Sequence, residues 1–146
     1  MSNHFKTRLN TPIPPAHAES LAKLSAIDSG SLELAMTVCQ AADERKGANI
    51  SLLRVADVCY LADYFVIITG FSNVQVRAIA RSIQDTIEDD WQRKPEQVEG
   101  MSEGRWVLLD YGEVIVHIFL PQEREFYNLE AFWGHAERIE FFASES

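Results

Sequence analysis

The sequence contains few cysteines, and it has no long apolar run. Cys39 and Cys59 occur in a chain of 146 residues, and neither has another Cys or a His at the spacing of a metal site. Two buried, reduced thiols are therefore a better interpretation than a disulfide or a redox pair. The longest apolar runs are too short to cross a bilayer, and the first residues lack the apolar stretch of a signal peptide. We expect a cytoplasmic protein without membrane contact.

Basic residues are also scarce. The chain has 13 Lys and Arg against 22 Asp and Glu, which gives a formal net charge of −9. Proteins that bind nucleic acid directly neutralise phosphates with Lys and Arg, so this balance disfavours direct contact with RNA or DNA. An acidic chain is instead suited to docking on a basic protein through complementary charge. The composition thus indicates a protein partner.

The common motifs of nucleotide and metal sites are missing. Gly70-Phe71-Ser72 lies where a predicted strand meets a predicted helix, and backbone amides at such a junction can hold a phosphate. The junction contains neither G-x-G-x-x-G nor G-K-[ST], so a simple strand-to-helix turn is the preferred interpretation. Asp57, Asp63 and Asp110 show no D-x-D spacing, which favours capping or solvated roles over a metal site. The sequence predicts no cofactor and no metal.

The apolar residues that are present suffice for one core. A length of 146 residues with 47% hydrophobic residues suits a single domain. Residues 1–28 contain Pro12, Pro14 and Pro15 and show no periodic apolar face, so we predict a disordered tail there. Residues 29–146 are predicted to form the folded domain.

Apolar periodicity predicts several helices and strands in this domain. Helical spacing marks residues 31–46 and 72–91, and a last helix is predicted from Pro121 to Trp133. Apolar runs predict strands at residues 50–55, 64–69, 97–99, 106–110 and 114–119. The order α-β-β-α-β-β-β-α predicts an α/β (α+β) fold, in which helices flank a mixed sheet of about five strands.

A hairpin is predicted at the centre of the sheet. Asp110 can hydrogen-bond its own backbone and Gly112 can supply the positive φ of a tight turn between the two apolar runs. Alternation places Trp106, Leu108 and Asp110 on one face and Tyr111 on the other. An aromatic residue beside a carboxylate suits a protein-binding anchor, although a place in the core explains Trp106 equally well. We interpret His117 as a core or interface histidine rather than a general base.

Several motifs, in the same order, resemble the Iojap family of ribosomal silencing factors (RsfS). The resemblance covers about residues 31–139. It is carried by Asp63-Tyr-Phe-Val-Ile-Ile-Thr-Gly70, Val98-Glu-Gly100, Trp106-Val-Leu-Leu-Asp-Tyr-Gly112, Val114-Ile-Val-His-Ile-Phe119 and Arg124-Glu-Phe-Tyr-Asn-Leu-Glu130 before Trp133. It implies a nucleotidyltransferase-like fold without the catalytic carboxylate pattern of that enzyme class.

The same resemblance implies a function. Members of the family bind the large ribosomal subunit through its protein number fourteen, block joining of the small subunit, and lower translation when nutrients are short. They form homodimers when free. The positions that match the family's partner-binding surface are Glu99, Gly100, Trp106, Asp110, Tyr111 and Gly112. Such a steric repressor is not an enzyme. The alternative is a nucleotidyltransferase-like enzyme that binds a nucleotide at Gly70-Phe71-Ser72.

Overall fold

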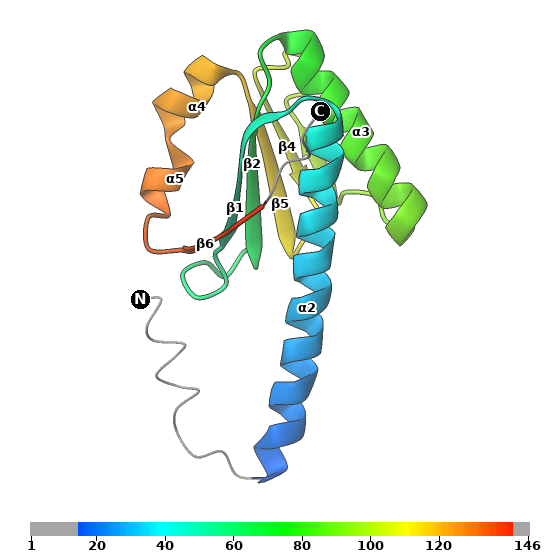
Figure 1. Ribbon diagram of the computed structural model, residues 1–146, viewed down its shortest axis with the longest axis vertical. Coiled ribbons are helices and arrows are strands. Elements are labelled where there is room, and N and C mark those ends of the chain that lie inside the picture. The colour runs from blue at the N-terminus through cyan, green and yellow to red at the C-terminus, as the bar shows by residue number, and fades with distance from the viewer. Residues whose placement is uncertain (1–14, 142–146) are drawn as a thin grey trace.

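A mixed sheet with helices on both faces makes up the body of the molecule (Figure 1). The computed structural model describes residues 15–141, with side chains from residue 30 onward. Helices α2 (Pro15–Glu44) and α3 (Asn73–Trp91) cover one face of the sheet, and α4 (Pro121–Tyr127) and α5 (Leu129–Phe132) lie against the other. The predicted α+β class is confirmed.

Within the described residues the sheet has six strands in the order β3-β4-β5-β2-β1-β6. The strands are β1 (Ala48–Arg54), β2 (Tyr64–Thr69), β3 (Gln97–Glu99), β4 (Trp106–Asp110), β5 (Val114–Phe119) and β6 (Glu137–Ile139). Strands β2 and β5 run parallel, and all other neighbouring pairs run antiparallel. Every residue of β2 is buried, which explains its unbroken apolar run. The predicted β4–β5 hairpin is confirmed.

The main core lies between the sheet and helices α2 and α3. Helix α3 contributes a buried stripe that includes Val76, Ile79 and Ile83, at the spacing predicted from the sequence. This stripe belongs to the same buried cluster as Val107 and Leu109 of β4. The alternate residues of β4 therefore point to the other face of the sheet.

Helix α2 is longer than the sequence predicts. It begins at Pro15, whereas apolar periodicity placed the start of the first helix at Ser31. Proline is compatible with the first helical position, because the N–H that it lacks has no intrahelical acceptor there. The prediction of disorder is therefore wrong for residues 15–28, and residues 1–14 lie outside the described part of the chain. The first part of α2 extends beyond the sheet, so no apolar stripe was needed (Figure 1).

The C-terminal part differs from the prediction in two ways. Asn128 has a φ of 44°, a left-handed conformation that Asn tolerates, and it divides the predicted last helix into α4 and α5. Residues 137–139, for which no element was predicted, pair with β1 as the additional strand β6. A strand of three mostly exposed residues has too little alternation to be recognised from sequence.

Candidate functional site

The sheet face opposite α2 and α3 is only partly covered. Helices α4 and α5 pack on its β1, β2 and β5 side, as Figure 1 shows. Cross-strand partners share a face, and the register pairs Glu99 with Leu108, and Asp110 with both Gln97 and Ile115. None of these side chains is fully buried. We call the following set the open strip: Gln97, Glu99, Trp106, Leu108, Asp110 and Ile115.

Trp106 lies where the open strip meets helix α4. Its ring centroid is 4.8 Å from that of Phe119 and 4.6 Å from that of Tyr127. The indole N–H donates a hydrogen bond of 3.1 Å to Nδ1 of His117. The side chain is half-buried, so one part packs in an aromatic cluster while another part faces solvent. The core interpretation of Trp106 thus holds for part of its ring, and its role in an interface stays a prediction.

His117 is a buried member of that cluster. Its side chain is 5% exposed, and burial lowers its pKa from 6.5 to about 4. Nδ1 accepts from Trp106, so the proton of the neutral ring resides on Nε2, which has no hydrogen-bond partner among the described residues. The burial confirms the interpretation of His117 as a core histidine.

The hairpin turn at one end of the open strip is held on both sides. Asp110 Oδ1 accepts from the backbone N–H of Gly112 at 2.8 Å, as the sequence predicts. Arg93 forms two hydrogen bonds to Glu113, of 2.8 and 2.7 Å, and donates to the Tyr111 carbonyl oxygen at 2.6 Å. The Arg93 guanidinium holds the pKa of the Glu113 carboxyl below its ordinary value. Arg93, just after the end of α3, therefore fixes the shape of the turn.

Among the residues implied by the resemblance, the structure brings together Glu99, Trp106 and Asp110 on the open strip. Tyr111 is different, because its side chain is 1% exposed and packs in the cluster below α3. Burial raises the pKa of its hydroxyl to about 12. The Tyr111 side chain supports the turn from behind and is not accessible to a partner.

The two glycines of the set serve backbone geometry. Gly100 has a φ of +87°, and a Cβ atom there would overlap the carbonyl oxygen of Trp106. Gly112 has a φ of +90°, and a Cβ atom would lie 3.3 Å from Glu96 Oε2. Glycine adopts such φ values without steric cost. The resemblance did not single out Leu108 and Ile115 of the open strip. Alternation already placed Leu108 on the face of Asp110, but only the strand register shows that Leu108 adjoins Glu99 and that Ile115 adjoins Asp110.

Two amides of the Gly70-Phe71-Ser72 junction are already hydrogen-bonded, and that of Gly70 donates to the Phe119 carbonyl oxygen at 2.9 Å. The Phe71 N–H donates to Gln75 Oε1 at 2.7 Å, and the Gln75 N–H donates to Ser72 Oγ at 3.0 Å. These bonds cap the first turn of α3, with Ser72 as its N-cap. A Cβ atom on Gly70 would lie 2.8 Å from Val76 Cγ2, so glycine permits close packing of the helix on the strand. The geometry favours the simple turn over a phosphate site.

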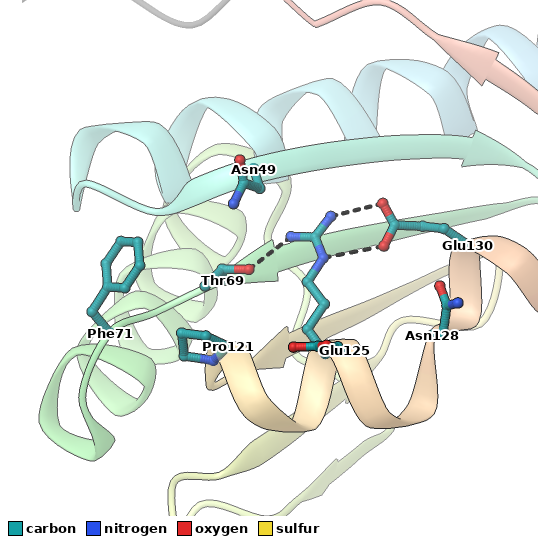
Figure 2. A pocket seen from close by; sticks show the side chains of 8 residues that line it. Asn49, Thr69, Phe71, Pro121, Glu125, Asn128 and Glu130 are labelled. Carbon is teal, nitrogen blue, oxygen red and sulfur yellow. Dashed lines mark hydrogen bonds and ion pairs between the residues drawn. The ribbon is translucent and has the colours of Figure 1, made fainter.

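A hollow of about 250 Å³ lies next to this junction (Figure 2). Arg124 donates to Glu130 Oε1 and Oε2 at 3.1 and 2.8 Å, to Thr69 Oγ1 at 2.9 Å and to Ser51 Oγ at 3.1 Å. The hollow is lined by Asn49, Thr69, Phe71, Pro121, Arg124, Glu125, Asn128 and Glu130. The partly buried charges of Arg124 and Glu130 therefore satisfy each other, and with Thr69 and Ser51 they join α4 and α5 to β1 and β2.

Other kinds of site find little support in the described part of the chain. No three His, Cys, Asp or Glu side chains in residues 30–141 are arranged to hold a metal ion. No described helix has the length and apolar character that spanning a membrane requires. Cys39 and Cys59 are free thiols, but only Cys39 is buried as predicted, whereas Cys59 is partly exposed. Burial raises the pKa of Cys39 to about 12.

Comparisons with known proteins agree with one another. Residues 28–146 match the model of a family described as "Ribosomal silencing factor during starvation". The chain is 41% identical over 105 residues to ribosomal silencing factor RsfS of Bacillus subtilis, and the aligned region covers 72% of this chain and 86% of that protein. It is also 41% identical over 113 residues to the chloroplastic protein Iojap of Zea mays, covering 77% of this chain and 49% of the maize protein.

A mouse relative named "Mitochondrial assembly of ribosomal large subunit protein 1" is 30% identical over 92 residues, which is 62% of this chain and 40% of the mouse protein. The chain thus spans half or less of the maize and mouse relatives. A crystal structure of a protein from Chromobacterium violaceum is similar with a TM-score of 0.69 at 33% identity, covering 78% of this chain and 92% of that chain.

Proposed function

Because the chain belongs to the family of ribosomal silencing factors, we propose that it represses translation by binding the large ribosomal subunit. The name of the mouse relative supports that subunit as the partner. The proposed contact is protein number fourteen of the subunit, as the resemblance implies. The bound protein would exclude the small subunit by its bulk and lower translation when nutrients are short. A steric block of this kind requires no catalysis.

The open strip is the observation that carries this proposal. It combines the apolar side chains of Trp106 and Leu108 with the carboxylates of Glu99 and Asp110 on one accessible face. Half-buried aromatic residues are common anchors of protein interfaces. Carboxylates at the rim of such a surface attract a basic partner, in keeping with the net charge of −9. The strip is therefore suited to a basic protein rather than to phosphates.

Two further points belong to the proposal. The free protein is a cytoplasmic homodimer, and light scattering of the purified chain measures its mass directly.

The nucleotide-binding alternative has less support, because the amides at Phe71 and Gln75 are occupied by side chains of the chain itself. An increase in melting temperature with millimolar ATP and magnesium would revive that alternative, since a ligand of the native state raises its apparent stability.

Sedimentation with purified ribosomal subunits tests the proposed function. The wild-type chain should migrate with the large subunit and reduce the amount of joined ribosomes. Trp106→Ala should weaken binding by about 2 kcal/mol, the loss typical of an interface hot spot. Phe132→Ala is the matched control, because Phe132 is an exposed aromatic residue of α5 outside the open strip.

Two results would contradict the proposal. If the wild-type chain migrates with neither subunit, binding to the ribosome is excluded under those conditions. If a folded Trp106→Ala chain binds as well as Phe132→Ala, the open strip is not the contact surface. Melting curves of both variants show whether each remains folded.

A further inference from the structure

His117 and Trp106 form a hydrogen bond that links the core to the accessible surface. His117 lies on β5 directly opposite Leu108, and its Nδ1 atom is 3.1 Å from Trp106 Nε1. The histidine is buried, whereas the tryptophan is half-buried at the edge of the open strip. One end of the bond is thus fixed in the core and the other end belongs to the proposed contact surface.

The chemistry of the two groups makes the bond directional. An indole N–H can only donate, and a neutral imidazole nitrogen without a proton can only accept. A half-buried indole N–H that loses its acceptor must turn toward water or remain unsatisfied, and either outcome moves or destabilises the ring. The orientation of the Trp106 ring therefore depends on the position of His117 Nδ1.

Neighbouring rings hold the imidazole in place. The Phe119 ring stacks parallel to it, with centroids 6.0 Å apart and an interplanar angle of 9°. The Phe65 ring meets it edge-on at 5.1 Å, and Phe65 in turn contacts Trp133 at 5.4 Å. This cluster joins β2, β5 and the segment after α5. Because interiors of this density leave side chains few alternative rotamers, the acceptor occupies one fixed position.

We propose that His117 is a positioning residue for partner binding: it accepts the indole N–H of Trp106 and so holds that ring in the orientation that meets the partner. This inference rests on the proposed function, because it concerns the same open strip. His117 itself does not touch the partner, since its side chain is 5% exposed. Its contribution is transmitted through one hydrogen bond.

Substitutions at His117 separate the hydrogen bond from packing. Asparagine can place an acceptor oxygen close to the position of Nδ1, whereas phenylalanine keeps a ring and removes the acceptor. His117→Phe should weaken binding to the large subunit about tenfold, the effect of losing one hydrogen bond. His117→Asn should remain within about threefold of the wild type. His117→Leu is a second acceptor-free variant, for use if phenylalanine is too large for the cluster.

A double-substitution cycle provides a readout that a merely structural role would not change. In a Trp106→Phe chain no indole N–H is present, so adding His117→Phe should weaken binding no further. The indole N–H resonance of Trp106, measured by NMR in the free protein, should shift in His117→Phe and stay close to wild type in His117→Asn. Both measurements use the full-length chain.

The outcomes distinguish a role of His117 in positioning Trp106 from a general structural role. Equal losses from His117→Phe in the wild-type and Trp106→Phe chains would show a general structural role and overturn the inference. Wild-type binding by a folded His117→Phe or His117→Leu chain would overturn it while leaving the proposed function intact. Absence of ribosome binding by the wild-type chain itself would overturn the proposed function, and this inference with it.

Discussion

Two buried polar atoms on opposite faces of the sheet have no hydrogen-bond partner among the described residues: Nε2 of His117, near the open strip, and the hydroxyl oxygen of Tyr111, below α3. Burial lowers the pKa of His117 to about 4 and raises that of Tyr111 to about 12, so both side chains are neutral at pH 7. Neutral groups are compatible with apolar surroundings, whereas a buried charge is not. Charge reaches the strip from Glu99 and Asp110 instead.

The buried histidine predicts a dependence of stability on pH. Its pKa is about 4 in the folded chain, against an ordinary value of 6.5. Above pH 6.5 the His117 imidazole is neutral in both the folded and the unfolded chain. As the pH falls toward 4, the imidazole binds a proton in the unfolded chain but not in the folded chain. The free energy of unfolding should therefore fall by about 2 kcal/mol between pH 7.5 and pH 5.

Urea denaturation at these two pH values measures the effect. His117→Asn removes the titrating group, so its free energy of unfolding should change much less over the same interval. The lowered pKa of Glu113 contributes mainly below this range, because stability from a carboxylate is lost only as the pH falls toward its pKa. A wild-type chain that is equally stable at pH 5 and pH 7.5 would contradict the buried, neutral histidine.

At the scale of elements, helices α4 and α5 are joined to the sheet by polar contacts as well as by apolar ones. Arg124 of α4 reaches Thr69 of β2 and Ser51 of β1, and it pairs with Glu130 of α5. Its side chain is 11% exposed and that of Glu130 is 28% exposed. These contacts position the helices that carry Tyr127, whose ring packs against Trp106. Helices α4 and α5 thus also shape the border of the open strip, through the contact of Tyr127 with Trp106.

Arg124→Met should loosen α4 and α5. The substitution leaves the Glu130 carboxylate in a partly buried site without its cationic partner, with only the hydrogen bond from Ser51 Oγ remaining. The cost is about 2 kcal/mol, below that of a fully buried pair. Urea denaturation measures the loss, and faster hydrogen exchange of amides 121–133 locates it. Replacing both residues, in Arg124→Met/Glu130→Met, should recover part of the loss.

Lys94→Met is the control for that substitution. It breaks the exposed pair of Lys94 and Glu88, which are 3.6 Å apart with side chains 77% and 51% exposed. Exposed pairs contribute little, so stability should change by less than about 1 kcal/mol. Equal effects of Arg124→Met and Lys94→Met would show that the Arg124 network is unimportant for stability.

At the scale of the whole molecule, the net charge of −9 predicts how the chain meets its partner. Acidic residues lie on the open strip and also on the exposed face of α3, which includes Asp85 and Asp89. Long-range attraction to a basic surface depends on total charge and weakens with salt, whereas the bound complex depends on local complementarity. Removing a charge from the open strip should therefore slow association with the partner more than removing a charge elsewhere on the surface.

Two matched double variants test this point. Glu99→Gln/Asp110→Asn and Asp85→Asn/Asp89→Asn change the net charge equally, and Asn at 110 keeps an acceptor for Gly112. The strip variant should lower the association rate with the large subunit severalfold at low salt, and the helix variant should lower it less. Stopped-flow measurements at two salt concentrations provide the rates. If the two variants have the same rates, the open strip is not where the partner docks.

Local pattern was sufficient to predict several parts of this molecule. The sequence by itself determined the buried strand β2, the apolar stripe of α3, the β4–β5 hairpin with its Asp110–Gly112 bond, and the family through ordered motifs. These features depend on side-chain periodicity or on residues close together in the chain. The likeness to nucleotidyltransferases stays a prediction.

The tertiary structure alone decided which of the predicted residues are accessible and which elements join the sheet. The match of Tyr111 to a family motif could not show that its side chain packs below α3. Alternation could not show that β3 places Glu99 beside Leu108. Strand β6 was missed because it exists through pairing with β1, far away in the sequence. The Arg124 network and the bond between Trp106 and His117 likewise form only when distant segments meet, since side-chain partners depend on packing rather than on local propensity.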